Sequence, residues 1–289
     1  MMPKKFGTHT QAVAGVIEAL LMVALVTIVI SVVQLYYIPQ VMEQKEAEHM
    51  DQVFNQFSSL KSMVDMQTIT RSSSPISSMI TLGSRELPYF ITAKATGDLS
   101  TNENPAFKIE FNPPLIGMAN SVSLTSIVYR ADNSYFVDQS YILEGGGIIV
   151  TQPDGISVMR SDPSISAVNN SGTIVISMDY PHVMALPGKN NTGGDGKCYI
   201  RTNYSSNRTY NGPIDSPFGY IKIYTQYLNA WNTSLFGILG IYDANGYLHI
   251  TVHGTQPSGY IEITPGSKNI QFKLNIIDIL VQIGPGWVE

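Results

Sequence analysis

The stretch AVAGVIEALLMVALVTIVISVVQLYYI, residues 12–38, decides the fold of this chain. From Ala19 to Ile38 it contains no charged residue, and a helix of that length is about 30 Å long, which matches the hydrocarbon core of a bilayer. A helix also satisfies its own backbone polar groups in lipid. We therefore expect a membrane-spanning helix that begins at Val13. A carboxylate inside a membrane-spanning helix is energetically costly, so Glu18 is expected to have either a partner of opposite charge or a functional role.

The charge distribution predicts how this helix is oriented. The chain has 289 residues and a formal net charge of −5, yet Lys4 and Lys5 precede the apolar stretch with no acid before Glu18. A positive flank of this kind is typical of a cytoplasmic end, so the bulk of the chain should lie outside the cell. The acidic remainder argues against a nucleic-acid partner, which requires clustered positive charge.

The N-terminus resembles that of archaeal type IV pilin-like proteins and archaellins, including uncharacterised proteins of methanogens. The matching features are Lys4-Lys5, Gln11, Gly15, Glu18-Ala19-Leu20 and the apolar run that follows. The resemblance covers about the first 70 residues, and it implies that residues 1–12 are a basic leader cut by a leader peptidase. Two processing positions fit: Gln11, which is preceded by Thr10 rather than Gly or Ala, and Gly7.

The resemblance also implies a role for Glu18 in subunit assembly. In a filament core of low dielectric, the new N-terminal ammonium of one copy would neutralise the Glu18 carboxylate of its neighbour. The alternative is that Glu18 lies near the cytoplasmic headgroups, where a carboxylate costs little. The partners implied are the membrane and other copies of this chain or related pilins.

Beyond Pro39 the helical pattern resumes in amphipathic form, so we expect one helical region over residues 13–71. Apolar residues recur at helical spacing on one face; they are Met50, Val53, Phe54, Phe57, Leu60 and Val64. This face needs a partner, which is either the chain's own β domain or a coiled-coil seam with neighbouring copies.

Residues 75–289 alternate short β-like runs with Gly, Pro, Asn and Asp breaks, which predicts an extracellular β domain. Several runs, such as FKIEF and YIKIYTQ, have an apolar and a polar face. The fold class is therefore α+β: a long N-terminal helix followed by an all-β, antiparallel, sandwich-like domain. Residues 226–239, around Trp231, are a candidate helix within it.

The single cysteine and the Asn-x-Ser/Thr sequons indicate the environment in which this domain folds. Cys198 is the only cysteine, so no disulfide forms within the chain and a buried thiol is expected. Asn-x-Ser/Thr sequons are candidate glycosylation sites of a surface glycoprotein; they occur at Asn169, Asn190, Asn203, Asn207 and Asn232.

The sequence contains no recognisable catalytic, cofactor-binding or metal-binding motif. His249 and His253 would lie about 13 Å apart along a strand, too far to share a metal, and Gly145-Gly146-Gly147 lacks the Lys-Ser/Thr of a phosphate loop. We therefore expect a non-enzymatic protein without cofactors: a pilin-like filament subunit. The alternatives are a monomeric, single-pass surface glycoprotein that binds a ligand such as glycan, and an anchored enzyme.

Overall fold

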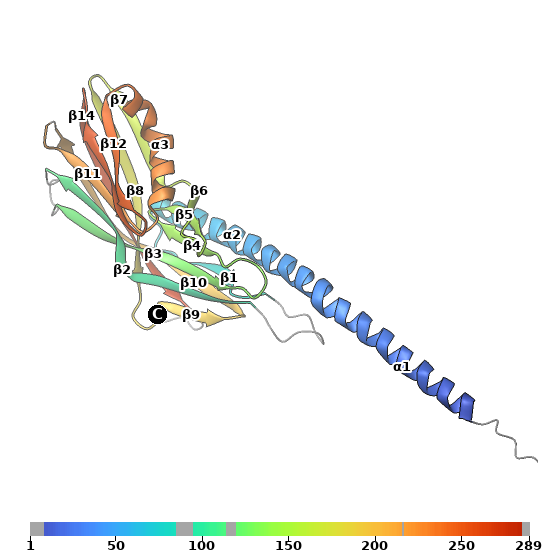
Figure 1. The fold of residues 1–289 in the computed structure, drawn as a ribbon. Helices are drawn as coiled ribbons and strands as arrows, with labels where there is room; N and C mark the ends of the chain where they lie inside the picture. Colours follow the sequence, from blue (N-terminus) through green and yellow to red (C-terminus); the bar gives the residue numbers. More distant parts are fainter. Residues whose placement is uncertain (1–8, 85–94, 114–119, 216, 285–289) are drawn as a thin grey trace, which may run out of the picture.

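The computed structural model describes residues 9–84, 95–113, 120–215 and 217–284, without the side chains of 9–12 and 102–106. A long helix projects from a β-rich domain (Figure 1). The helix consists of α1 (His9–Val32), the π-helical turn η1 (Val33–Tyr37) and α2 (Ile38–Thr70). It begins four residues before the expected start at Val13, because nothing between His9 and Val13 interrupts a helix. The α+β fold class is confirmed.

Pro39 lies inside the helix rather than at its end. A proline has no N–H, and in a regular α-helix its ring would clash with the carbonyl four residues earlier, here that of Leu35. The wider turn η1 ends two residues before Pro39, and the N–H of Ile38 bonds to the carbonyl of Val33, five residues back. This local widening makes room for the ring, so the helix continues from the apolar half into the amphipathic half.

The described part of the β domain contains two sheets. The first has the order β1-β10-β14-β8-β7; its strands are β1 (Ile76–Thr81), β7 (Ser164–Asn170), β8 (Thr173–Ala185), β10 (Lys197–Ile214) and β14 (Asn269–Ile283). The second has the order β12-β13-β11-β2-β3-β4-β5-β6, with β9 also paired to β2. Its strands are β2 (Thr96–Asn112), β3 (Ser121–Asp132), β4 (Ser140–Glu144), β5 (Gly147–Thr151), β6 (Ser157–Ser161), β9 (Asn191–Gly194), β11 (Tyr220–Thr225), β12 (Leu248–Thr255) and β13 (Ser258–Pro265).

One of the described strand pairings departs from the antiparallel pattern: β14 runs parallel to β8. Parallel neighbours need a long connection, and here the chain forms β9 to β13 and α3 (Leu228–Ala244) before it returns as β14. The helix α3 contains Trp231, as expected for residues 226–239, and it extends five residues further.

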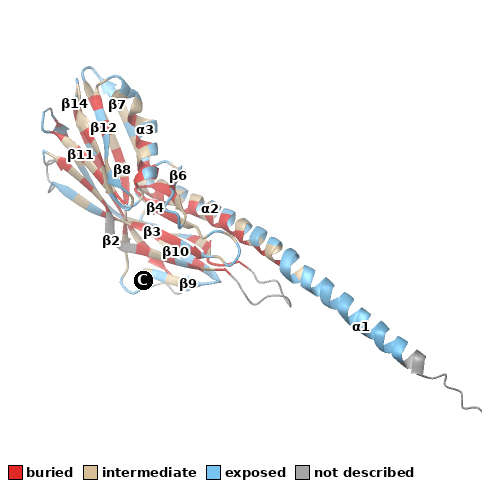
Figure 2. Cartoon of the chain, in the orientation of Figure 1, coloured by how far each residue is buried: buried red, intermediate tan, exposed pale blue. Residues whose placement is uncertain are grey.

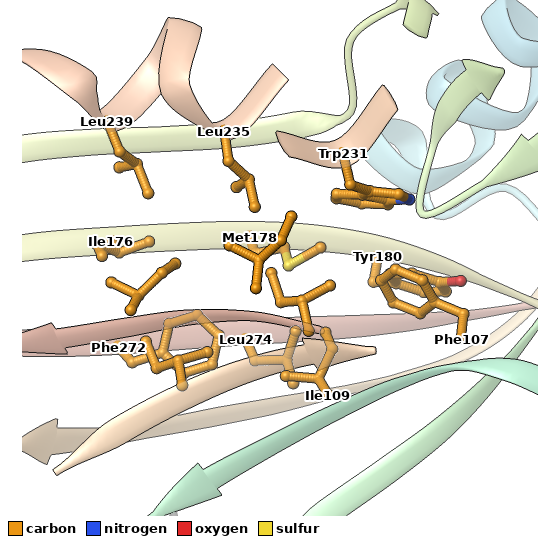
Figure 3. Close-up of a cluster of buried hydrophobic side chains, with 14 of the residues drawn as sticks. Phe107, Ile109, Ile176, Met178, Tyr180, Trp231, Leu235, Leu239, Phe272 and Leu274 are labelled. Carbon is orange, nitrogen blue, oxygen red and sulfur yellow. The ribbon is translucent and has the colours of Figure 1, made fainter. Parts of the chain in front are cut away.

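The interior contains two clusters of buried apolar side chains. In the first, α3 covers strands of both sheets; Figure 3 shows Trp231, Leu235 and Leu239 directed toward Met178 and the aromatic rings of Phe107 and Tyr180. The Trp231 ring lies 4.9 Å from that of Phe107 between centroids. Burial of such large side chains supplies most of the stability of a domain without disulfides.

The second cluster contains the apolar face of α2. Met50, Val53, Phe57, Leu60 and Val64 are buried against strands of both sheets. Phe54 is half-buried at the margin of this cluster. Of the two predicted partners for this face, the structure shows the chain's own β domain. Figure 2 shows the change along the helix, which is exposed in α1 and buried on one side where α2 docks.

Candidate functional site

The first candidate functional feature is the apolar helix that projects from the β domain. Side chains from Val13 to Tyr37 are exposed, apart from the half-buried Val33. The helix is long and apolar enough to cross a membrane, and none of its most apolar window is buried within the chain. An apolar surface of this length is unstable in water and requires lipid or protein around it. The segment is thus suited to single-pass membrane anchoring.

The predicted processing and assembly residues lie at the start of this helix. Glu18 is exposed, and no hydrogen bond or ion pair joins it to another described residue. Gln11 belongs to the first turns of α1, although its side chain is not described. Gly7 lies outside the described residues. A rise of about 1.5 Å per residue places the backbone of Gln11 about 10 Å from that of Glu18 along the helix axis.

A buried carboxylate joins the helix to the β domain. Glu46 of α2 is fully buried, and its oxygens accept hydrogen bonds from three successive backbone N–H groups: Ser134 at 3.1 Å, Tyr135 at 2.7 Å and Phe136 at 2.6 Å. Bonds from backbone N–H groups to a carboxylate are among the stronger hydrogen bonds in proteins. Glu46 therefore fixes the loop that follows β3 against the helix.

Other polar side chains of α2 form hydrogen bonds to β1 and β10 of the first sheet. Gln56 bonds to both the backbone N–H and the hydroxyl of Thr81, at 2.8 and 3.0 Å. His49 contacts the carbonyl of Thr81 at 3.0 Å, and the amide of Gln67 donates to the carbonyl of Thr202 at 2.9 Å. Such bonds have strict geometry, so they define the rotation and depth at which α2 docks.

The five sequons are spread over the domain. Asn169 on β7 is exposed, and the other four asparagines are half-buried. The side-chain amide oxygen of Asn169 accepts a 2.8 Å bond from Lys268, and the side-chain amide oxygen of Asn207 accepts one from the Tyr204 hydroxyl. The amide oxygen of Asn232 on α3 is buried, and no described residue bonds to it. By accessibility, Asn169 is the best candidate for modification, and glycosylation remains a prediction for all five.

A cluster on the first sheet contains Ser, His and Asp side chains but not in a catalytic arrangement. The Asp278 carboxylate accepts bonds from Ser206 at 2.6 Å and from Arg208 at 2.9 Å, and it contacts His182 Nδ1 at 2.9 Å. Burial opposes ionisation, but these three contacts lower the pKa of Asp278. In a hydrolase triad the serine bonds to the histidine, whereas Ser206 bonds to the aspartate. The cluster is an ion-pair network across β8, β10 and β14.

A second buried carboxylate lies in the interior. Glu144 accepts bonds from the Trp231 indole N–H at 2.8 Å and from the Thr225 hydroxyl at 2.9 Å. Burial raises the pKa of Glu144 to about 7, although both bonds oppose the shift. Glu144 is 2% exposed. Its bond to the Trp231 indole makes it a polar anchor for α3.

The outer face of the second sheet carries a row of rings. Cross-strand pairing places His253 beside Tyr260 and Tyr260 beside Tyr224, with ring centroids 4.7 and 5.0 Å apart. Lys108 lies over the Tyr224 ring at 4.9 Å. A shallow groove of ≈ 420 Å³ borders Tyr224 and Tyr260. Because the rings pack on one another, their edges and hydroxyl groups remain for a ligand.

Comparison with protein-family models, with curated proteins and with solved structures found no match. Among the described residues, no group of three or more His, Cys, Asp or Glu side chains could hold a metal ion. Sequence reasoning missed Glu46, Glu144 and Asp278 because each was one of 22 acidic residues without a motif. The alternation of FKIEF and YIKIYTQ did predict strands with one apolar and one polar face.

Proposed function

We propose that this chain is a pilin-like structural subunit of an extracellular, type IV pilus-like filament. The observation that supports this most directly is the apolar helix from Val13 to Tyr37, which is exposed apart from Val33 and charged only at Glu18. Before assembly, lipid covers this surface. In the filament, the same surface packs against the helices of other copies, and the β domain is displayed outside.

The position of Glu18 supports such packing. The amino group of a chain that begins at Gln11 is about 10 Å away from Glu18 along its own helix. It can approach the Glu18 of a neighbouring helix that is displaced by that distance. Gly15 and Ala19 are small residues near Glu18 that leave a shallow groove on the helix surface. Small residues of this kind let two helix backbones come close. In such a pair each charge would neutralise the other, so neither the ammonium group nor the Glu18 carboxylate would be uncompensated in the low-dielectric core.

N-terminal sequencing of the native protein tests the proposal at its first step. A start at Gln11, or directly after Gly7, supports processing by a leader peptidase. With an intact Met1 start, the chain would have no amino group at residue 8 or Gln11 to pair with Glu18, which would contradict the filament. Electron microscopy of surface preparations then shows whether filaments contain the chain.

Two variants separate assembly from anchoring. Glu18→Gln keeps the size of the side chain but removes its charge, so filaments should be lost while the chain stays in the membrane fraction. Glu43→Gln is the matched control, because Glu43 is an exposed carboxylate of α2 beyond the apolar half. Normal filaments from Glu18→Gln would contradict the role of this charge.

A second candidate function is supported by the ring row of His253, Tyr260 and Tyr224. A monomeric anchored protein could bind a ligand such as a glycan in the adjoining groove, where Gln226 and Ser258 add polar groups. Tyr224→Ala should then abolish retention of surface glycans by cells, and filaments should be absent. Thr251→Ala, on the same face of the sheet, is the control.

A further inference from the structure

A polar pocket of ≈ 310 Å³ lies where α2 first meets the β domain. Its lining residues are Lys45, Glu48, His49 and Gln52 of α2, Thr81 at the end of β1, Gly83 and Ser84 after it, and Lys197 at the start of β10. Three segments that are distant in sequence thus converge on one space. Polar groups gathered in this way need either each other or a ligand.

The charges that line this pocket are predominantly positive. Lys45 and Lys197 come from different elements, and no ion pair or hydrogen bond joins either ammonium group to a described residue. Glu48 is the acidic residue of the lining, and its carboxylate accepts a 2.9 Å bond from Gln44. Two cations that have no partner among the described residues stand out in one pocket of a chain with a net charge of −5. They attract an anion.

Two buried side chains of the lining have unused hydrogen-bonding capacity. The Nδ1 atom of His49 and the hydroxyl of Ser84 are buried and have no hydrogen-bond partner among the residues that the structure describes, and the two residues are 5% and 7% exposed. The other ring nitrogen of His49 must donate to the carbonyl of Thr81, because a carbonyl only accepts. Burial lowers the pKa of His49 and favours the neutral ring, so Nδ1 accepts a bond from the P–OH group of a soluble phosphate or from a glycerol hydroxyl of a lipid headgroup. Unpaired buried polar atoms are costly, which favours a bound ligand.

The pocket also lies near the membrane surface in the anchored protein. Tyr36 and Tyr37 end the exposed apolar stretch, and such rings settle at the membrane–water interface. At about 1.5 Å per residue, Lys45 follows Tyr37 by about 12 Å along the helix. Headgroups extend about 5–8 Å beyond the hydrocarbon core, and a lysine side chain can reach back toward them.

We propose that this pocket binds a phosphate group, carried either by a lipid headgroup or by a soluble phosphate. Two lysines supply the point charges that phosphate requires, and Ser84 and Gln52 of the lining add neutral donors. The lysines disfavour a divalent cation. No residue of the pocket belongs to the apolar helix surface of the proposed filament, so this site can be tested independently of assembly.

The test uses the full chain in nanodiscs. In uncharged lipid, inorganic phosphate is titrated by isothermal calorimetry. In discs that contain equal amounts of phosphatidylglycerol and uncharged lipid, native mass spectrometry counts the phosphatidylglycerol molecules that stay bound. Each arm is run on the natural chain, on the Lys45→Gln/Lys197→Gln double variant and on Lys61→Gln. Lys61 is the control because it lies on α2 in an ion pair with Asp65.

The double variant should lose binding at least about tenfold, whereas Lys61→Gln should bind like the natural chain. Phosphate binding in uncharged discs identifies a soluble phosphate as the ligand. Retention of phosphatidylglycerol without binding of inorganic phosphate identifies a lipid headgroup. The proposal is overturned if neither arm shows binding by the natural chain, or if the double variant equals the natural chain in every arm that shows binding.

Discussion

The carboxylate of Glu46 accepts a 2.6 Å hydrogen bond from the backbone N–H of Phe136, which lies ninety residues later in the chain. The bond crosses from the helix to the β domain just beyond the half-buried Pro39. Together with the buried face of α2, it makes the domain and the docked helix one packed unit. A filament built on the helix would therefore position the β domain without a flexible linker between them.

Glu46→Ala should weaken this attachment. The change leaves the backbone N–H groups of Ser134, Tyr135 and Phe136 without their buried acceptor. The free energy of unfolding should fall by about 2–4 kcal/mol, and hydrogen exchange at these three amides should accelerate. Denaturant unfolding of the full chain in detergent and amide exchange measure both effects. Glu43→Ala, an exposed position on the same helix, should change neither quantity.

Glu144 should make stability depend on pH. Its pKa is about 7 in the folded protein against an ordinary value of 4.5, chiefly because of burial. Between about pH 4.5 and pH 7 the folded state therefore binds more protons than the unfolded state. The free energy of unfolding falls as pH rises through this range. The total loss should be about 3 kcal/mol and should level off above pH 7.

Glu144→Gln carries no titrating group and should remove this slope. Unfolding midpoints measured from pH 4 to pH 8 for both chains isolate the contribution of Glu144, since all other titrating groups are shared. Parallel curves for the two chains would show that the carboxylate is not responsible.

Phe57→Ala should produce a cavity between α2 and the sheets. The Phe57 ring is fully buried and contacts the rings of Tyr129 and Tyr141 at 6.4 and 6.0 Å between centroids. The expected loss is about 3–5 kcal/mol in the free energy of unfolding. Met66→Ala on the exposed side of α2 should cost within about 0.5 kcal/mol. Similar unfolding midpoints for the two variants would argue against the docked position of α2.

Gly145→Ala tests the contact between the β4–β5 turn and α3. Gly145 has φ +63°, and an added Cβ would lie 2.7 Å from ring atoms of Trp231. Gly155 has φ +83° but open space around it, so Gly155→Ala carries only the backbone cost of about 1–2 kcal/mol. Gly145→Ala should lose about 1–3 kcal/mol more by overpacking. Near-UV circular dichroism of Trp231 should change only in Gly145→Ala.

Much of the architecture could be predicted from local patterns. The apolar run and the stripe of Met50, Val53, Phe57 and others have helical periodicity, and the structure confirms a helix and its buried face. Cys198 is buried, as expected for a lone thiol, and burial raises its pKa. These features depend on residues close together in sequence, so the pattern carries the information.

The candidate sites depended on residues that are far apart in sequence. Lys45 and Lys197 line one pocket, and His253, Tyr260 and Tyr224 form one row only because strand order and register bring them together. The two lysines have no spacing that a motif could capture, and Tyr224 joins the hairpin neighbours His253 and Tyr260 only through the pairing of β11 with β13. The same holds for Glu46, whose partners are backbone N–H groups and therefore carry no sequence signal.

The sequence by itself determined that a long apolar helix with one carboxylate precedes a β-rich domain, because hydropathy and periodicity act through neighbouring residues. The tertiary structure alone decided which face of the helix the β domain covers and which acidic groups are buried. It also decided where two lysines meet. Those outcomes depend on long-range packing and pairing, in which each contact is selected by the fit of the whole domain.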